Sequence, residues 1–457
     1  SLTESATLVG LLTSPNNYSP FKNPEKSLKK RNLVLKCMLE CKFIDENEYS
    51  QAISEPLNAK KTQNKGRFSD YIGAVFDELE ELNLNAYDLA RGCTVKTFLN
   101  AELQNYLNQL SYDCDNAVIV TDKDGGVNAY KSTISGAKRQ PGSTAKPTFV
   151  YAPAIEEKIL HPHTRILDEK VNFNGYSPEN FDKKYHGYVS ATDSLKYSYN
   201  VPAVKTLNAL TITTSEKYLT KMNIALEDDE KNLSLALGGM KYGLDIKSIA
   251  DCYSVFQSGG IYSPSRFIKE IKTSDGKTAY SFEKSQSRVF SQGTCSLMNG
   301  MLLQTAKDGT AKKLGSLNYE VAAKTGTCGT AEGNTDAYAI GYTSEHCIGV
   351  WLGDANNKKL NITGGGDACT RLKSILESLY SDHSPQKLDT ESGTSAVEID
   401  AEEYYSNNKI LLADEISPKL NKLTVKVLQG NEPKEKSTAF SNPEIKTPSI
   451  KADGKGV

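Results

Sequence analysis

Three short motifs along the chain combine a serine hydroxyl with amines that could move its proton. They are Ser143-Thr144-Ala145-Lys146, then Ser198-Tyr199-Asn200, then Lys324-Thr325-Gly326-Thr327. Each string alone occurs by chance in long proteins, but all three in this order are typical of enzymes that transfer acyl groups through a serine. The order therefore predicts covalent acyl-serine chemistry at a site where the fold brings the three segments together.

Ser143 is the candidate nucleophile and Lys146 the candidate base. Gly142-Ser143 precedes a predicted helix, so Ser143 lies in a first turn with unpaired N–H groups and a positive dipole. Lys146 shares that helix face three residues later. An amine accepts a proton only when neutral, which burial and a second cation such as Lys324 both favour. Alone, Lys146 would more simply be a surface lysine. Pro153 predicts either a kink in this helix or its early end.

The second motif supplies a hydroxyl and an amide. Ser198 and Asn200 are two residues apart, so in an extended segment both side chains face the same way. Ser198 could pass a proton between a lysine and a leaving group, and Asn200 could hold a substrate amide together with Lys146. Considered alone, the segment is equally typical of a polar turn.

The third motif follows a predicted strand and supplies a cationic anchor. Gly326 would let a ligand approach the backbone closely, and an edge strand here could pair with a peptide. Lys324, Thr325 and Thr327 could hold a carboxylate. Backbone N–H groups of Ser143 and Thr327 are the candidate oxyanion donors, each worth about 3 kcal/mol in comparable sites. The simpler alternative is a glycine-containing strand end with no ligand.

Composition excludes several other classes of function. The chain has 457 residues, a formal net charge of −2 and a mean hydropathy of −0.48, which indicate a globular protein of more than one domain and give no sign of nucleic-acid binding. The longest apolar runs fall short of the roughly 20 residues that span a bilayer. The nine cysteines show no metal-site spacing, and we expect neither a metal nor a cofactor.

The elements that must position the motifs predict an α+β fold. Residues 116–121 read as a strand with a turn and a second strand after it, and 336–342 with 347–352 as a second hairpin. These strands predict a central antiparallel sheet. The long stretch between them is mainly helical, which favours an α+β arrangement over alternating β/α units.

Four segments follow from these patterns. Residues 1–57 read as a small helical unit, with Pro24 in one first turn and a capping box at Asp45 and Glu48. Residues 58–112 read as a linker region, and 113–384 as the domain with the motifs. Residues 385–457 read as an extension with a strand near 422–428 and a disordered end after Gly430. Because the chain opens at Ser1 like the tail of a domain, we expect an excised piece of a longer protein.

Longer strings around the motifs resemble the bifunctional, class A penicillin-binding proteins. The strings are Arg139–Pro147, Ser198–Lys205, Leu235–Gly239, Gly309–Ala311 and Asp336–Tyr338. Residues 1–57 resemble the end of that family's glycosyltransferase domain. The likeness covers roughly residues 1 to 355 and fades after that.

The resemblance implies a DD-transpeptidase of peptidoglycan synthesis with a penicillin-binding serine transpeptidase fold. Ser143 would attack the bond between two D-alanines of a stem peptide, and a neighbouring stem would take up the acyl group; β-lactams would acylate Ser143. The expected partners are stem peptides, β-lactams and other cell-wall synthesis proteins. The expected location is the extracytoplasmic face of a bacterial membrane, reached through an anchor upstream of this chain. Polymerase activity is not expected.

Two alternatives stay open, and two features depart from the family pattern. A DD-carboxypeptidase or β-lactamase would use water to resolve the acyl-enzyme, and a penicillin sensor or scaffold would not turn over. A hydrolytic glutamate string occurs at Glu81–Asn85, before the nucleophile rather than after the second motif, and we interpret it as chance. Cys328 stands where a small or hydroxyl residue is more usual. We interpret it as an accidental neighbour rather than a modifiable thiol.

Overall fold

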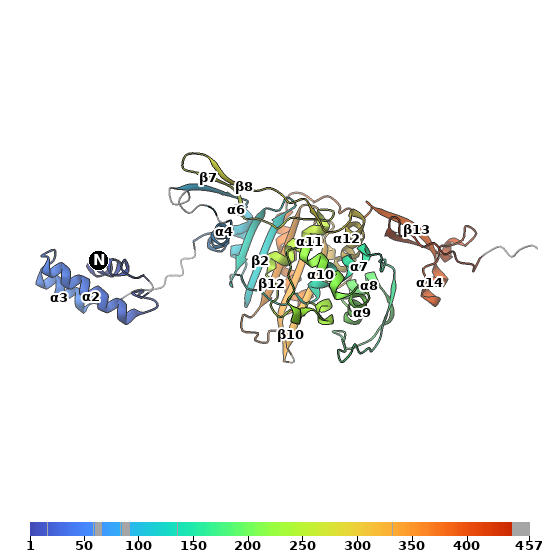
Figure 1. The fold of residues 1–457 in the computed structure, drawn as a ribbon, viewed down its shortest axis with the longest axis horizontal. Coiled ribbons are helices and arrows are strands. Elements are labelled where there is room, and N and C mark those ends of the chain that lie inside the picture. The colour runs from blue at the N-terminus through green and yellow to red at the C-terminus, as the bar shows by residue number, and fades with distance from the viewer. Residues whose placement is uncertain are drawn as a thin grey trace, which may run out of the picture. The chain divides into compact units, whose positions relative to one another are not determined.

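The computed structural model describes residues 1–15, 17–57, 59, 66–82, 84, 92–134, 136–330 and 332–440. Its contacts separate two compact units, Ser1–Arg67 and Phe68–Val457. Figure 1 shows the ribbon of both.

The first unit is helical, as the sequence predicts. It contains α1 (Leu2–Leu11), α2 (Pro24–Glu40) and α3 (Glu46–Ser54) around a small apolar core that includes Leu35 and Ala52. The predicted capping box is confirmed: the Asp45 carboxylate accepts the N–H of Glu48, and the Glu48 carboxylate accepts the N–H of Asp45. The start of α3 is thereby fixed by sequence-local bonds.

A five-stranded antiparallel sheet forms the centre of the second unit, in the order β10-β11-β12-β2-β3. The strands are β2 (Asp115–Asp122), β3 (Val127–Ser132), β10 (Ala322–Thr330), β11 (Gly333–Tyr342) and β12 (His346–Gly353). Both predicted hairpins, β2–β3 and β11–β12, are confirmed. The strand with the third motif, β10, is an edge strand, paired with β11 so that Lys324 lies opposite Ile340.

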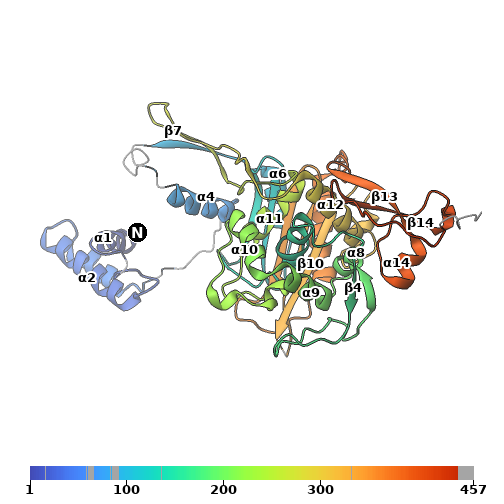
Figure 2. The same ribbon diagram turned by 45° about the vertical axis from the view of Figure 1, so that its right-hand side comes forward.

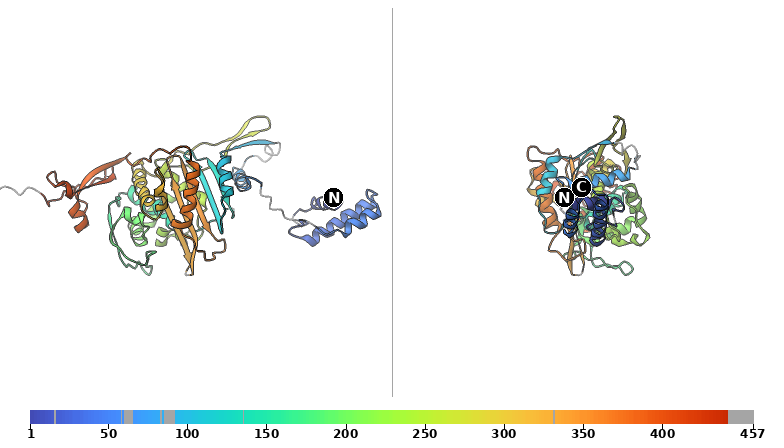
Figure 3. Two further views of the ribbon diagram at one scale, coloured as in Figure 1. Left: turned by 180° about the vertical axis from the view of Figure 1, so that it is seen from behind. Right: turned by 90° about the vertical axis from the view of Figure 1, so that its left-hand side faces the viewer.

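Helices cover both faces of this sheet. One face packs against α11 (Ile246–Gln257) and α12 (Gln292–Lys307), which lie in front of the sheet in Figures 1 and 2. The other face packs against α6 (Ala101–Gln109) and α13 (Cys369–Leu379); Figure 3 shows that side from behind. Alternate strand residues supply the two cores, as the pleat requires: Val118 and Val120 face α6 and α13, and Ile119 faces α11.

The mainly helical segment between the two hairpins contains the first two motifs. It consists of short helices: η1 (Gly142–Ala145), η2 (Lys146–Tyr151), α7 (Ala152–Glu156), α8 (Ala191–Lys196), α9 (Asn200–Leu210), α10 (Ile212–Lys221), η3 (Asp228–Glu230) and η4 (Leu233–Leu237). A two-stranded ribbon of β4 (Arg165–Asp168) and β5 (Gly187–Ser190) leads into α8. The predicted combination of a central antiparallel sheet and a mainly helical subdomain is confirmed.

Smaller elements complete the second unit. The segment predicted as a linker contributes α4 (Ser69–Glu81), β1 (Cys93–Thr97) and α6 to it. A ribbon of β1, β7 (Ile268–Thr273) and β8 (Thr278–Ser281) forms a second sheet, and β6 (Ile261–Tyr262) pairs with β9 (Ser287–Arg288). Two short helices, η5 (Lys312–Ser316) and η6 (Gly364–Ala368), flank the sheet edge.

The C-terminal extension forms a small module that has its own β-sheet. β13 (Thr394–Asp400) pairs with β14 (Lys422–Leu428), with α14 (Ala401–Asn407) and η7 (Lys419–Asn421) between them. The predicted strand at 422–428 is thus present. The predicted disorder after Gly430 begins too early, because Leu412 exchanges backbone hydrogen bonds with Glu435 and Ser437. The remainder of that prediction, residues 441–457, lies outside the described residues. Within the described ranges, no helix has the length and apolarity to cross a bilayer.

Candidate active site

Ser143 lies where three backbone segments meet at close range. It belongs to η1, a 3-10 helix that begins at Gly142, whose φ is +57°. A Cβ on Gly142 would lie 2.4 Å from the sulfur of Cys328, and one on Gly238 would lie 2.3 Å from the carbonyl oxygen of Gly142. Side chains are therefore excluded at both glycines. The Ser143 side chain is half-buried, and its hydroxyl has no hydrogen-bond partner among the described residues.

The helix after Ser143 differs from the predicted one. η1 is followed by a π-helical segment, η2, and only then by the α-helix α7. Of the kink or early end predicted at Pro153, the structure shows a change from π-helical to α-helical geometry at Ala152 and an end of the helix at Glu156. Pro153 itself occupies the first turn of α7, where its missing N–H breaks no hydrogen bond of that helix. The wider π turn absorbs the proline that a continuous α-helix could not.

The amine of Lys146 is enclosed by the second motif. The lysine is fully buried, and its Nζ donates to the carbonyl oxygens of Ser198 (2.7 Å) and Tyr199 (3.1 Å) and to Oδ1 of Asn200 (2.8 Å). The hydroxyl of Ser198 lies 3.3 Å from the same nitrogen. The structure thus brings Lys146, Ser198 and Asn200 together, as their motifs predict.

Lys324 joins this cluster from the sheet edge. It is also fully buried, and its Nζ donates to the Ser198 hydroxyl at 2.7 Å and to the carbonyl oxygen of Thr325 at 2.9 Å. One hydroxyl is therefore shared by two lysine amines. The three segments that carry the motifs converge on Ser198.

The electrostatics of the two amines are unusual. No carboxylate forms an ion pair with either lysine among the described residues. Burial lowers the pKa of Lys324 to about 7. Burial, and then the nearby charge of Lys324, lowers the pKa of Lys146 well below its ordinary value. Each shift increases the share of neutral amine near neutral pH, which is the form that accepts a proton.

Ser198 has a strained backbone conformation, and Asn200 is held in place by a loop that the sequence analysis did not predict. Ser198 has a φ of +62°, a conformation that non-glycine residues adopt only when their surroundings impose it. The N–H of Asn200 donates to Oδ1 of Asn180 (2.7 Å), and its side-chain amide donates to the carbonyl oxygen of Glu179 (2.7 Å). The Asn180 amide is in turn fixed by the buried Asp168 carboxylate. No local pattern marks Asn180 or Asp168.

The third motif is packed more tightly than expected. A Cβ on Gly326 would lie 3.0 Å from the methyl group of Thr144 and 3.1 Å from the carbonyl oxygen of Pro141, so its missing side chain admits the Ser143 segment. The Thr325 hydroxyl bonds that of Thr310 (2.8 Å). Thr310 lies in the Gly309–Ala311 string, which resembles the family pattern, so the sequence could have identified it as a site residue.

The remaining site residues on β10 are Thr327 and Cys328. The hydroxyl of Thr327 accepts the N–H of Gly364 at 3.1 Å, and only a run of glycines in the sequence hints at that contact. The thiol of Cys328 donates to the carbonyl oxygen of Gln140 at 3.4 Å, and burial raises its pKa to about 12. A thiol held protonated in this way favours the interpretation of Cys328 as an accidental neighbour.

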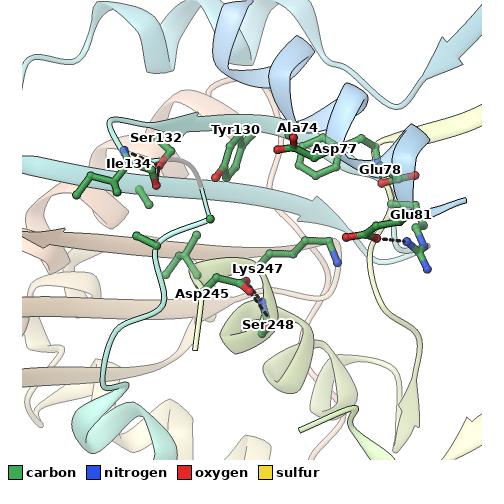
Figure 4. A pocket seen from close by; sticks show the side chains of 16 residues that line it. Ala74, Asp77, Glu78, Glu81, Tyr130, Ser132, Ile134, Asp245, Lys247 and Ser248 are labelled. Carbon is green, nitrogen blue, oxygen red and sulfur yellow. Dashed lines mark hydrogen bonds and ion pairs between the residues drawn. The ribbon is translucent and has the colours of Figure 1, made fainter. Parts of the chain in front are cut away.

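A separate cavity of about 270 Å³ lies between α4, β3 and the start of α11 (Figure 4). Its lining includes Glu78, Glu81 and Asp245, with Lys247 and Arg266 beside them. Glu81, the first residue of the string interpreted as chance, lies here and pairs with Arg266 at 3.4 Å. Positions 83 and 85 of that string are outside the described residues. This cavity thus has charges of both signs in its lining, whereas the lysine cluster has only cations.

Comparison with known proteins places the chain in a family. Residues 111–364 match the penicillin binding protein transpeptidase domain, so the chain belongs to this family of transpeptidase domains. It is 33% identical over 404 residues to penicillin-binding protein 1F of Bacillus subtilis, covering 82% of this chain and 56% of that protein. Penicillin-binding protein 1A/1B of the same organism is 28% identical, covering 96% and 52%. The predicted resemblance to class A members is confirmed.

Solved structures share the fold. The crystal structure of penicillin-binding protein 1A from Haemophilus influenzae superposes with a TM-score of 0.67 at 18% identity, covering 96% of this chain and 87% of that one. A Mycobacterium tuberculosis relative solved in complex with penicillin V gives a TM-score of 0.61 at 22% identity, covering 70% and 94%. The chain spans about half the length of the curated relatives that it matches.

Proposed function

We propose that this chain is a serine DD-transpeptidase that cross-links the stem peptides of peptidoglycan. The observation that carries the proposal is the shared hydroxyl of Ser198, which contacts both Lys146 and Lys324 with no carboxylate among the described residues to neutralise them. Such an arrangement depresses both pKa values and has no evident value for stability. Membership of the transpeptidase family supports the same reaction class.

In the acylation step, neutral Lys146 accepts the proton of the Ser143 hydroxyl as its oxygen attacks the carbonyl carbon between two D-alanines. Backbone N–H groups of Ser143 and Thr327 stabilise the oxyanion that forms. Ser198 relays a proton from the lysines to the departing nitrogen, so the C–N bond breaks and the terminal D-alanine leaves as an amine. An ester on Ser143 remains. Lys324, Thr325 and Thr327 hold the terminal carboxylate during this step.

In the second step, an amine of a neighbouring stem attacks the ester. The proton of the attacking amine passes through Ser198 and Lys146 to the Ser143 oxygen. The ester bond breaks, and Ser143 is left with its free hydroxyl. Asn200 holds the donor peptide's amide and orients Lys146 through its Oδ1. A β-lactam would acylate Ser143 in the same way as the donor peptide.

The cellular location, the membrane anchor, the partners and the domain boundaries are also part of the proposal. We place the whole protein at the extracytoplasmic face of a bacterial membrane, anchored through a segment upstream of this chain and working with other cell-wall synthesis proteins. Within this chain, we assign residues 1–57 to the end of a glycosyltransferase domain, 58–112 to a connecting region, 113–384 to the transpeptidase domain and 385–457 to an extension.

Intact-mass analysis after treatment with penicillin tests the assignment. We expect one adduct of the mass of the antibiotic on the native chain, and none on Ser143→Ala with its thermal midpoint unchanged. Ser392→Ala, at an exposed serine of the C-terminal extension, is the matched control and should label fully. An adduct that survives Ser143→Ala would show that the wrong nucleophile is named.

The lifetime of the adduct decides between the proposal and its alternatives. A transpeptidase should keep the label for many minutes, since water resolves its acyl-enzyme slowly. Rapid loss would favour a carboxypeptidase or β-lactamase. A stable adduct without any cross-linked product from peptidoglycan precursors would favour a penicillin sensor or scaffold.

A further inference from the structure

A cavity of about 550 Å³ lies between the helical subdomain and the C-terminal module. Residues of α8 and α12 form one side, and residues of α14 and β14 form the other. In Figures 1 and 2, α14 and β13 lie beyond α8 and α12, at the end of the unit. The volume falls in the range of sites that bind organic ligands.

The wall formed by α12 lacks a side chain at Gly300. Ser296, Gly300 and Gln304 follow each other at four-residue spacing, so they share one helix face, and all three line the cavity. A Cβ on Gly300 would meet no atom within 4 Å. Glycine inside a helix costs roughly 0.5 to 1 kcal/mol relative to alanine. Since packing does not require Gly300, its contribution is the open space in front of it.

The floor of the cavity holds a hydroxyl without a partner. Ser296 is 1% exposed, and its Oγ makes no hydrogen bond within the described part of the chain although it lines the cavity. A buried hydroxyl left unpaired costs free energy in the empty chain. The cost is recovered when a ligand in the cavity supplies the missing partner.

The opposite wall of the cavity carries two aromatic rings. Tyr404 and Tyr405 of α14 both line the cavity, and the guanidinium of Arg165 lies 5.4 Å and 5.8 Å from their ring centres. The Tyr404 hydroxyl donates to the carbonyl oxygen of His163 at 3.0 Å, which ties α14 to the helical subdomain. Tyr405 remains 62% exposed. Its ring is an open apolar surface beside the cavity.

The charged groups of the lining already have partners. The carboxylate of Asp193 accepts the Ser190 hydroxyl at 2.7 Å, Lys196 pairs with Asp308 at 2.7 Å, and Lys426 pairs with Glu391. The polar side chains of the lining that have no hydrogen-bond partner in the described part of the chain are neutral groups, among them the hydroxyls of Ser296 and Thr424, the amide of Gln304 and the ring of His163, whose pKa burial lowers. Neutral hydrogen-bonding groups beside apolar surfaces and an aromatic ring suit a sugar, whose rings have hydroxyl edges and apolar faces.

The cavity is connected to the candidate active site by one short helix. Lys196 lines the cavity, and Ser198 follows only two residues later, at most about 7 Å along the backbone. The carbonyl oxygen of Lys196 also accepts the N–H of Thr310, the residue that bonds Thr325. A polymer held in the cavity would thus lie next to the groups that carry the chemistry.

We propose that this cavity binds the glycan backbone of a peptidoglycan strand and so presents its stem peptide to Ser143. The inference rests on the proposed function for the identity of the polymer. The C-terminal extension is then a substrate-positioning module, because α14 and β14 supply one wall of the sugar site. Stem peptides carry carboxylates and would need a cation without a partner, which the described lining does not offer.

Calorimetric titration with a β-1,4-linked tetramer of N-acetylglucosamine tests the proposal. The chain is first acylated with penicillin, so that binding at Ser143 does not contribute. We expect saturable binding of one tetramer. Gly300→Leu should weaken it at least about tenfold, which is about 1.4 kcal/mol. Ser296→Ala should weaken it several-fold while leaving the thermal midpoint equal or higher, because it removes an unpaired polar group.

Gly73→Leu is the matched control. Gly73 also lies inside a helix where an added Cβ would meet nothing within 4 Å, but that helix is α4, away from this cavity. The variant should bind the tetramer like the native chain. No saturable tetramer binding, or binding unaffected by both Gly300→Leu and Ser296→Ala, would overturn the proposal. So would a stem pentapeptide, without sugar, whose binding is lost in Gly300→Leu.

Penicillin labelling of each variant separates the two proposals. Gly300→Leu and Ser296→Ala should label at the native rate, because neither residue touches the lysine cluster. If the native chain does not label, the proposed function fails, and titration of the untreated chain still decides whether the cavity binds sugar.

Discussion

The lysine cluster and the cavity of Figure 4 bury charge in opposite ways. In the cavity, the carboxylate of Glu78 accepts the N–H groups of Phe267 (2.8 Å) and Ile268 (3.1 Å), with Arg266 and Lys247 nearby. In the lysine cluster, two buried amines meet only neutral oxygens. Burial disturbs the pKa in both places, raising that of Glu78 and lowering those of the lysines.

We interpret the difference as one between a group that serves the fold and groups that serve the proposed chemistry. Glu78 satisfies two backbone donors that would otherwise be buried without partners, and it ties α4 to the start of β7. The lysines satisfy no such need, and a carboxylate beside them would raise their pKa values and remove their use as bases. Uncompensated burial of like charges is costly, so it supports the catalytic role proposed for the lysines. Variants in the two regions should therefore have opposite consequences.

The largest effect is expected for Lys146→Ala. Lys146 is the base that the proposal assigns to the Ser143 proton, so without its amine the rate of acylation by penicillin should fall by about three or more orders of magnitude, as in other coupled catalytic sites. Stopped-time labelling followed by mass analysis measures the rate. Lys307→Ala, at an exposed lysine of α12, is the control and should match the native chain. A loss of only a few-fold would transfer the role of base to another group.

Lys324→Met should abolish efficient acylation and yet stabilise the fold. Below pH 7 the buried ammonium is charged, and replacing it with an apolar side chain should raise the free energy of unfolding by roughly 1 to 4 kcal/mol. Between about pH 7 and 10.5 the unfolded native chain binds one more proton than the folded one, so native stability rises with pH. The advantage of the variant should therefore shrink across this window.

Urea unfolding at several pH values measures this advantage. Trp351 is the only tryptophan, and it lies buried in β12, so its fluorescence reports on the second unit alone. A variant less stable than the native chain at low pH would show that Lys324 contributes to folding, and the contrast with Glu78 would be lost.

Sequence patterns predicted which motif residues come together better than they predicted the interactions that hold them in place. The three motifs and both hairpins follow from spacings of a few residues, which local rules capture. The support of Asn200 by Asn180 and Asp168 spans 20 to 32 positions and depends on the path of a loop. Long-range satisfaction of polar groups has no period, so it leaves no pattern to detect.

Glu78→Ala should have the reverse effect of Lys324→Met. It leaves the N–H groups of Phe267 and Ile268 without their acceptor, so the free energy of unfolding should fall by about 1 to 3 kcal/mol. Acylation should stay near the native rate at a temperature where the variant is folded. Asp77→Ala, at a neighbouring carboxylate of α4 that also lines the cavity, is the control and should change stability little. Lost acylation in folded Glu78→Ala would mean that this cavity also supports the chemistry.

The smallest effect is expected for Cys328→Ser, which tests whether proximity alone makes a group functional. The thiol lies against Gly142, but burial raises its pKa to about 12, so it is protonated and unreactive at neutral pH. Serine keeps a donor for the carbonyl oxygen of Gln140. The acylation rate should change less than about threefold, since no charge is altered. In the native chain, iodoacetamide should modify the exposed Cys37 long before Cys328. If both react equally fast, burial at this edge of the site does not control protonation, and the depressed pKa values of Lys146 and Lys324 lose their physical basis.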